Sequence, residues 1–464
     1  MLRTRTLQPS LWDSVLPQVC LRLPAELERV DAWLDDDRFF APFRAHFDAR
    51  IGQPSVPIET NLRLMFLKFR YRLGFESLCR EVADSISWRR FCRIDIDGRV
   101  PHPTILMKIT TRCGDQAVLA LNEALLAKAV EQRLVKTGKV RADTTVVSAN
   151  VEYPTDSGLL ARSVVKISRL VRRIKAAGGA TRTLFRDRSR TAGRRVRSIG
   201  AKLKLRGAAA REQAHTAVLR ITGELADLAE RAGRDAEAIL ANARRALRRV
   251  TGRTRGRLRR AVDELATTIA RSRRIIAQSR QRLAGDKPDS ATRLVSLHDP
   301  DARPIAKGLI NRPVEFGYKA QVVDNEDGIV IDYTVEEGNP AGAPQLAPAI
   351  RRVTARTGTT PRAVTADRGY GEARVENELR EIGVETVAIP RKGQPGPART
   401  ATEHSRGFRT LIKWRTGSEG RISHLKHRYG WARSAVAGRD HTAAWCGHGI
   451  LAHNLVKITA LATT

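Results

Sequence analysis

Three acidic residues occur in sequence settings that favour chemistry, and Asp367 is the first. It follows residues 363–366, a run of small and β-branched residues that predicts a short buried strand. Gly369 and Gly371 then let the backbone turn before a predicted helix that starts near Glu372. A carboxylate at the carboxyl end of a buried parallel strand lies on the edge where α/β sheets bind ligands. The alternative is that Asp367 only caps the turn or the helix start.

Asp143 has the same kind of setting. It is the only acid in a second predicted strand, within residues 139–150, whose apolar positions are Val140, Ala142, Val146 and Val147. The alternative is a buried aspartate that only accepts hydrogen bonds from backbone amides.

The third acid, Glu419, is expected to open a helix for which Ser418 would be the N-cap. Helical spacing puts Glu419 and Lys426 on one face, and Arg415, just before the helix, could reach that acidic face. The alternative is a surface glutamate that favours the helix start. A neighbouring apolar stripe would anchor the helix to a sheet, and it comprises Ile422, Leu425 and Tyr429.

Three separated acids on two strands and a helix suit a pair of divalent metal ions acting at a phosphate. Carboxylate ligands favour Mg²⁺ or Mn²⁺ over zinc. The sequence contains no P-loop or other nucleotide-binding motif. A phosphodiester is therefore the natural substrate.

The charge of the chain points to a polyanionic partner. Its 464 residues include 83 Lys and Arg against 49 Asp and Glu, a formal charge of +34, and nucleic acid is the first candidate for such a chain. A membrane partner is not expected, because no lipidation signal or long apolar span occurs. The N-terminus does not read as a secretory signal, and the five cysteines form no CxxC pair. We therefore expect a cytosolic protein without structural zinc or a disulfide framework.

Residues 1–133 are predicted to be mostly helical. Leu62, Met65, Phe66 and Phe69 recur at helical steps, with cations on the other faces, including Arg63, Lys68, Arg70 and Arg72. Another helix is expected to start at Pro103 with Thr104 as its cap. Short helices with exposed cations fit a helix-turn-helix-like DNA-binding region, although an ordinary helical domain with a solvated basic face fits equally well. These cations are Arg89, Arg90, Arg93, Lys108 and Arg112.

Residues 158–288 carry most of the charge, with 35 Lys and Arg against 10 Asp and Glu, a net of +25. Apolar residues spaced three and four apart on both sides of Gly252 predict an antiparallel helical hairpin. The Arg surplus favours an arm that contacts DNA phosphates, especially through Arg244, Arg245, Arg248 and Arg249. The preceding residues 182–206 are basic and less periodic, which fits a mobile segment.

Strands are predicted to resume at about Pro313. Residues 316–323 and 329–333 form two candidates, joined by a polar hairpin connection over residues 324–328. A helix over 346–357, the Asp367 strand, a helix over 372–382 and a strand over 386–389 follow. Residues 390–397 form a basic loop rich in proline and glycine that contains Lys392.

These features resemble the DDE transposases of bacterial insertion sequences, over nearly the whole chain. The resemblance rests jointly on residues 140–147 (VRADTTVV), 153–157 (YPTDS), 366–370 (ADRGY), 417–422 (GSEGRI), 451–455 (LAHNL) and 83–91 (ADSISWRRF). It implies an RNase H-like mixed sheet, with Asp143, Asp367 and Glu419 as catalytic residues and ligands of Mg²⁺ or Mn²⁺.

One branch of the family carries a Tyr-Arg-Glu-Lys motif. Arg415, Glu419 and Lys426 match its spacing, whereas Ile412 stands where its tyrosine would be. The match therefore does not establish whether that branch's DNA-hairpin chemistry carries over, and Trp414 would be a substitute stacking ring.

The resemblance implies an α/β protein with a helical N-terminal DNA-binding domain (1–133), an RNase H-like core in two parts (134–157 and 291–464) and a basic helical insertion (158–290). It implies a transposase that binds the inverted repeats of its element, cleaves DNA and joins 3′-hydroxyl ends to target DNA, as a homodimer on double-stranded DNA in the bacterial cytoplasm or nucleoid. Arg368, Lys392, Arg415 and Lys426 would contact the DNA. The alternatives are a metal-dependent nuclease without strand transfer and a catalytically inactive DNA-binding protein.

Overall fold

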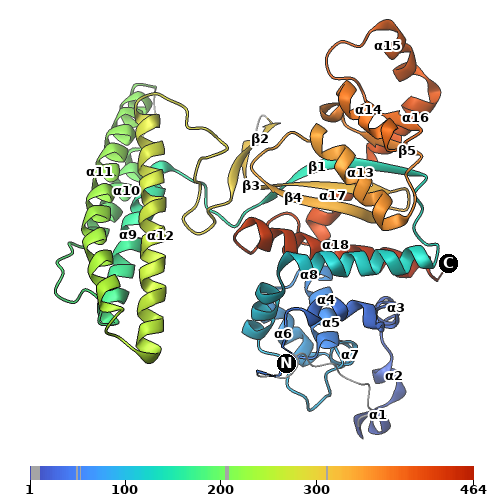
Figure 1. Ribbon diagram of the computed structural model, residues 1–464, viewed down its shortest axis with the longest axis horizontal. Coiled ribbons are helices and arrows are strands. Elements are labelled where there is room, and N and C mark those ends of the chain that lie inside the picture. Colours follow the sequence, from blue (N-terminus) through green and yellow to red (C-terminus); the bar gives the residue numbers. More distant parts are fainter. Residues whose placement is uncertain (2–10, 49–50, 53, 204–207, 310–311, 464) are drawn as a thin grey trace. The chain divides into compact units, whose positions relative to one another are not determined.

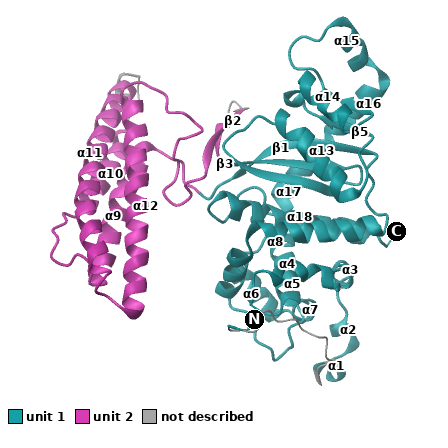
Figure 2. Cartoon of the chain, in the orientation of Figure 1, with its two compact units in different colours: residues 1–150, 317–464 teal, residues 151–316 magenta. Residues whose placement is uncertain are grey.

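The chain folds into two compact units. The computed structural model describes residues 1, 11–48, 51–52, 54–203, 208–309 and 312–463. Unit 1 comprises residues 1–150 and 317–464, and unit 2 comprises residues 151–316 (Figure 2). The chain thus leaves unit 1 just after its first strand and returns to it within a later strand.

A mixed sheet forms the centre of unit 1 (Figure 1). Strand β1 (Lys139–Ser148) pairs in parallel with β5 (Ala363–Ala366), which pairs in parallel with β6 (Thr386–Ala388). On its other side β1 pairs antiparallel with β3 (Arg312–Asn325), and β3 pairs antiparallel with β4 (Val330–Glu337). Among the described residues the strand order is β2-β3-β1-β5-β6, with β4 also on β3, and β2 is Arg303–Leu309.

Two details of the strands differ from the sequence prediction. Strands resume at Arg303, ten residues earlier than expected, because Pro304 and Gly308 within β2 are residues that are depleted in strands. Asp324 and Asn325 are not part of the hairpin connection but end β3, and both are buried. Their polar groups are satisfied inside: Asp324 by ion pairs with arginines, and Asn325 by donating from its amide to the carbonyl of Lys136.

Helices cover the sheet. Helix α17 (Gly417–Arg428) contacts β1, and α16 (Arg406–Arg415) contacts β5 and β6. Helix α18 (Arg439–Leu461) and α13 (Ala343–Thr357) both contact β4. Asn454 fixes α18 to β4, because its side-chain oxygen accepts from the Val330 N–H at 3.0 Å and its side-chain nitrogen donates to the Val330 carbonyl at 2.8 Å. The amide thus completes the backbone pairing at this end of β4. The remaining helices here are α14 (Ala373–Glu381), α15 (Pro397–His404) and the 3₁₀ helix η2 (Arg368–Tyr370).

The N-terminal part of unit 1 is helical, as predicted. Its elements are α1 (Leu11–Val15), α2 (Gln18–Leu21), α3 (Ala25–Leu34), η1 (Asp37–Phe39), α4 (Ala41–Arg44), α5 (Ile58–Arg70), α6 (Phe75–Asp84), α7 (Ile86–Phe91) and α8 (Pro103–Glu131). The cap of α8 is His102 rather than Thr104, because its Nδ1 accepts from the Thr104 N–H. Helix α18 packs on α8, α5 and α3, so the N-terminal helices and the sheet belong to one compact unit.

Helix α5 is buried on nearly every side, so the faces that carry Arg63 and Lys68 are buried as well as the apolar face. The Arg63 side chain is fully buried, and its Nε lies 2.6 Å from Asp31 Oδ1. Lys68 Nζ lies 4.2 Å from the ring centroid of Trp445 and 4.7 Å from those of Phe69 and Phe75. Burial is tolerated because one cation has a carboxylate partner and the other has ring faces.

Unit 2 is mainly a helical bundle. The predicted pair of long helices is present as α11 (Ala208–Ala246) and α12 (Gly252–Leu283), which pack on each other. Helices α9 (Asp156–Ala176) and α10 (Ser189–Lys202) pack with them, so the hairpin is half of a larger assembly (Figure 1). Part of the segment predicted to be mobile is therefore α10, which buries Ala192 and Ile199 in the bundle core.

The observed architecture confirms the predicted fold class. Three strands in antiparallel order (β4, β3, β1) continue into two parallel strands (β5, β6), and helices cover the sheet. This is an RNase H-like core, accompanied by a helical N-terminal region and a large helical insertion.

Candidate active site

Strand register brings Asp143 and Asp367 next to each other. Ala142 on β1 is the parallel partner of Ala366 on β5, and each aspartate is the next residue along its strand. Neighbouring strands lie about 4.8 Å apart, so the two carboxylates leave the sheet side by side. This is the edge at which α/β sheets bind ligands, as the sequence predicted for Asp367.

The Asp143 carboxylate is largely enclosed by its neighbours. Its Oδ2 accepts a hydrogen bond from Ser418 Oγ at 2.7 Å, and its Oδ1 accepts from the Thr144 N–H at 2.8 Å. Burial raises the pKa of Asp143, and the charge of Asp367 raises it further, while the two hydrogen bonds and Arg415 oppose the rise. The pair of aspartates therefore has more negative charge than its surroundings neutralise.

Glu419 lies near this pair but is not gathered into it. Arg415 stands between them: its Nη1 lies 3.7 Å from Asp143 Oδ2, and its Nη2 lies 3.9 Å from Glu419 Oε1. The Glu419 side chain is 77% exposed. Within the described part of the chain, no group of three or more His, Cys, Asp or Glu side chains is arranged to hold a metal ion. The structure thus places the two aspartates side by side. Glu419 lies at the exposed edge of the site, and the Arg415 guanidinium lies between it and Asp143.

The start of α17 differs from the prediction. Thr416 is the N-cap and makes no side-chain capping bond, and Ser418 lies inside the first turn. The Ser418 hydroxyl instead binds Asp143, which is possible because α17 packs directly on β1. The predicted apolar stripe is present, since Leu425 and Tyr429 are buried.

A buried ion-pair network holds the start of α17 against the sheet. Arg141 Nε and Nη2 donate to the two oxygens of Asp324 at 2.9 and 2.8 Å, and Arg141 Nη1 donates to the Trp414 carbonyl at 2.8 Å. Arg421 Nε lies 3.3 Å from the same carboxylate. Asp324 therefore connects β3 to β1 and to α17. Arg141 shares its strand face with Asp143 two residues later, and this alternation is a sequence signal for the network.

Gly417 permits the close approach of α17 to β1. A Cβ at this position would lie 2.5 Å from Arg141 Nη1, which is too close for real atoms. A larger residue would require either the Arg141 guanidinium, which Asp324 holds, or the start of α17 to shift.

The Asp367 side of the site is shaped by η2 and by β3. Asp367 Oδ1 accepts from the Gly369 N–H at 2.8 Å, so Asp367 caps η2, as the alternative prediction stated, while also lying beside Asp143. Buried Tyr370 accepts a hydrogen bond from Gln321 Nε2 at 3.1 Å. Burial raises the pKa of Tyr370, and both aspartates raise it further, so its hydroxyl stays protonated. Lys319 Nζ donates to the Pro340 carbonyl; burial lowers the pKa of Lys319, and the Asp367 charge opposes this only in part.

The other predicted DNA contacts in unit 1 have internal partners. Arg368 donates to the carbonyls of Arg391 and Gly393, and Lys392 Nζ lies 3.4 Å from Glu372 Oε1. Lys426 is half-buried in the last turn of α17. Trp414 does not present a free ring, because the Arg141 guanidinium and the Lys139 ammonium lie 4.7 and 5.1 Å from its ring centroid.

The candidate helix-turn-helix cations are also partly structural. Arg89 donates to the carbonyls of Ala83, Asp95 and Gly98, and Arg93 is buried beside Asp35 at 2.9 Å. These two residues hold the region together, which favours the ordinary helical domain for this stretch.

The four bundle arginines lie in unit 2, at and just beyond the end of α11. Arg244 and Arg245 belong to its last turn, and Arg248 and Arg249 follow it; all four are exposed.

The donor set at the sheet edge fits a hard divalent cation. Two adjacent carboxylates, one of them buried with a raised pKa, are the oxygen ligands that Mg²⁺ and Mn²⁺ prefer. Their unneutralised charge is what a cation would relieve. A cation held there would also attract a phosphate, so the edge is suited to phosphoryl chemistry.

Two family models match the chain. A transposase domain (DUF772) matches residues 20–112, and a transposase DDE domain matches residues 297–455. The first covers the N-terminal helices from the end of α2 to the first turns of α8, and the second contains Asp367 and Glu419 but not Asp143. No curated protein and no solved structure is significantly similar to the chain. No helix among the described residues is long and apolar enough to cross a membrane.

Proposed function

Since this chain belongs to the DDE transposases of insertion sequences, we propose that it binds the ends of its element, cleaves DNA there and joins the 3′-hydroxyl ends to target DNA. The observation that carries the proposal is the register of β1 and β5, which sets Asp143 beside Asp367 under the start of α17. Members of this family generally use a divalent metal ion.

In the proposed site, Asp143, Asp367 and Glu419 would hold Mg²⁺ or Mn²⁺. Such ions activate an attacking oxygen and stabilise the leaving oxygen of a phosphodiester. Ser418 keeps the Asp143 carboxylate oriented, and Arg141 with Asp324 keeps the helix that carries Glu419 close to the sheet. These contacts matter because phosphoryl transfer depends mainly on positioning and on neutralising charge.

Arg415 would move from the carboxylates to a DNA phosphate once the cation is bound. Its guanidinium contacts Asp143 and Glu419 only at 3.7 and 3.9 Å, longer than a strong charge-assisted hydrogen bond. The half-buried Lys426 is on the same helix, and it would make a further phosphate contact near the DNA end.

The proposed DNA partner is double-stranded, with a homodimer forming on the terminal inverted repeats. The charge of +34 supports the choice of DNA as the partner, because each Lys or Arg that contacts a phosphate releases counterions from the DNA.

A strand-transfer assay tests the proposal. Purified protein is mixed with labelled DNA carrying one element end, with unlabelled target plasmid and with Mg²⁺. Products joined to the target are expected. Cut products without joining would support a nuclease instead, and bound but uncut DNA would support an inactive DNA-binding protein. Asp143→Asn protein in the same assay identifies contaminating nuclease.

A further inference from the structure

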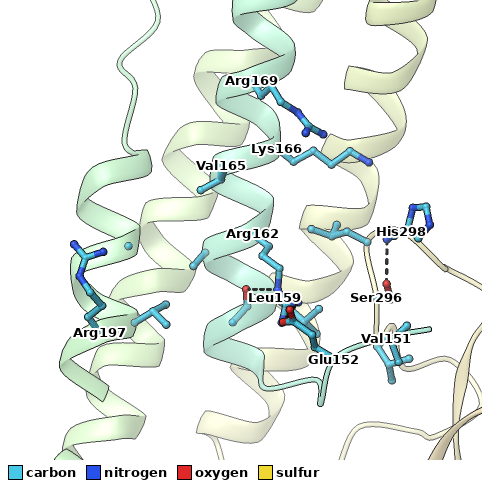
Figure 3. Close-up of a pocket in the computed structure, with 16 residues that line it drawn as sticks. Val151, Glu152, Leu159, Arg162, Val165, Lys166, Arg169, Arg197, Ser296 and His298 are labelled. Atoms are coloured by element: carbon cyan, nitrogen blue, oxygen red, sulfur yellow. Dashed lines mark hydrogen bonds and ion pairs between the residues drawn. The ribbon is translucent and has the colours of Figure 1, made fainter. Parts of the chain in front are cut away.

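Unit 2 has a basic groove whose lining includes neither the acids of the candidate active site nor the four arginines at the end of α11. The groove has a volume of about 720 Å³ and lies beside α9 and α10 (Figure 3). Its floor is apolar, with Leu159 and Val165 from α9 and Val196 from α10. All of its lining residues lie in unit 2.

Four cations line this groove. Arg162, Lys166 and Arg169 follow one another at helical spacing on α9, and Arg197 comes from α10 (Figure 3). Residues spaced by four and three lie on one face of a helix. The row from Arg162 to Arg169 spans about 10 Å, close to the rise of three nucleotides along one DNA strand at about 3.4 Å each.

Acidic residues neutralise only part of this charge. Arg162 Nη1 lies 2.7 Å from Glu152 Oε2, but that carboxylate is 81% exposed. Lys166 shares Glu264 with Arg173, at 3.6 and 2.9 Å. Within the described residues, exposed Arg169 and Arg197 have no acidic partner. Two guanidinium groups thus remain available to an anion.

The lining also shows how such an anion would be bound. Among the residues that line it there is no Phe, Tyr or Trp on which a base could stack, and its polar lining besides the four cations consists of Glu152, Ser296 and His298. Arginines in a row on an apolar floor fit a chain of phosphates and sugars instead.

We propose that this groove binds the phosphate backbone of duplex DNA without regard to sequence. The inference rests on the proposed function for its choice of polyanion. Arg169 and Arg197 make the principal contacts, and Lys166 and Arg162 add to them. The groove gives unit 2 a DNA-binding surface along its helices.

The test measures binding of the full-length protein to a labelled duplex of unrelated sequence over a range of salt concentrations. The double variant Arg169→Gln with Arg197→Gln is expected to lower the slope of log affinity against log salt by about 2, at roughly 0.9 for each lost phosphate contact. The matched control is Arg231→Gln with Arg234→Gln, which removes the same charge from exposed positions of α11 outside the groove. A slope that is unchanged, or lowered equally by the control, would overturn the proposal.

A second pair of variants tests the groove without changing its arginines, so that any effect of those substitutions on packing does not enter. Val165→Glu places a carboxylate in the groove from a side chain that is already 45% exposed, and Val165→Gln changes polarity alone. The glutamate variant should bind the duplex several-fold more weakly than the glutamine variant. Equal affinities would contradict a phosphate in the groove.

Cleavage of an element end by the same wild-type preparation separates the two proposals. If the wild-type protein binds DNA through the groove but never cuts it, the proposed function is contradicted and the groove proposal is not. If the wild-type protein cuts the element end and the groove variant binds DNA as the wild type does, the groove proposal is contradicted and the proposed function is not.

Discussion

Asp143, in the middle of β1, and Asp367, directly after β5, carry like charges on neighbouring strands, and burial limits how far water screens Asp143. Among the described residues, the guanidinium that forms an ion pair with Asp143 is that of Arg415, and it is shared with Glu419. The charge of Arg415 therefore does not balance the carboxylates of this site, and a bound cation would balance them further. The Ser418 hydroxyl orients the carboxylate without neutralising it.

Thermal unfolding tests this cation site without any DNA. Saturating Mg²⁺ or Mn²⁺, at about 100 times its Kd, should stabilise the wild-type protein by about 2.7 kcal/mol. Asp143→Asn and Asp367→Asn should each lose most of this gain. The control Asp440→Asn alters an exposed aspartate and should keep it. An Asp143→Asn protein that gains as much from Mg²⁺ as the wild type would contradict the assignment.

Local sequence singled out both aspartates as candidates, because an acid within a run of small and β-branched residues is itself a local signal, and the strand register sets them side by side. The role of Ser418 could not be predicted in this way. Its partner Asp143 lies 275 residues earlier in the chain, and only the packing of α17 on β1 brings them together. A serine beside a helix start favours an N-cap, so the local pattern led to the wrong role.

At the scale of elements, the site depends on Asp324 joining β3 to β1 and α17. Its side chain is only 3% exposed and interacts with both Arg141 and Arg421. The sequence hid this role, because Asp324 begins a polar, glycine-ended stretch typical of a hairpin connection. The register that pairs Arg141 with Asp324 across β1 and β3 decides the matter.

Asp324→Ala should destabilise unit 1 by about 3–5 kcal/mol, because it leaves buried arginine charge unpaired. Urea unfolding followed by tryptophan fluorescence measures this, since all six tryptophans belong to unit 1. Glu378→Ala is the control: it breaks an ion pair with Arg374, which is 86% exposed, and should cost less than about 1 kcal/mol. Equal losses in the two variants would argue against a supporting role for the network.

Helix α5 offers a test of the N-terminal packing through Lys68. Burial lowers the pKa of Lys68 to about 8, and the three ring faces around it offset part of that cost. Below pH 8 the amine is charged in both the folded and unfolded states, so the burial cost is fully present. Above the unfolded pKa of about 10.4 it is neutral in both states, and the cost is gone.

The stability of the wild type relative to Lys68→Met should therefore rise between pH 8 and pH 10.5, by up to roughly 3 kcal/mol. Urea unfolding at a series of pH values gives the difference. Lys136→Met, at a side chain that is 66% exposed, should show no such trend. A difference between wild type and Lys68→Met that stays constant with pH would mean that the buried amine titrates normally.

At the scale of the whole molecule, the chain divides into unit 1, which contains the candidate active site, and unit 2, an inserted and strongly basic helical bundle. The heptad spacing predicted α11 and α12, because their apolar residues repeat over many turns. The spacing could not predict that α9 and α10 pack with them, because the spacing of apolar residues along one helix does not specify which other helices it contacts. The RNase H-like sheet was implied by family resemblance rather than by the strand patterns alone.

The end of α11 gives a prediction of its own. Neutralising Arg244, Arg245, Arg248 and Arg249 to Gln should weaken binding to all DNA sequences and reduce the salt slope by up to about 4, at about 1 for each contact. Arg231→Gln with Arg234→Gln supplies the comparison for each charge removed. Gel-shift titrations at several salt concentrations measure both. If the slope does not change, this end of the bundle does not contact DNA.

The most direct test of the catalytic assignment is Glu419→Gln, measured as cleavage of a labelled element end beside gel-shift affinity for the same DNA, in Mg²⁺ and in Mn²⁺. Glutamine keeps the size of the side chain and the helix start but removes the ionised oxygen. Cleavage should fall by orders of magnitude while affinity is unchanged or slightly higher, because charge neutralisation carries much of phosphoryl transfer. Glu385→Gln, at an exposed glutamate elsewhere in unit 1, should cut normally. A Glu419→Gln protein that cuts at the wild-type rate would remove Glu419 from the active site.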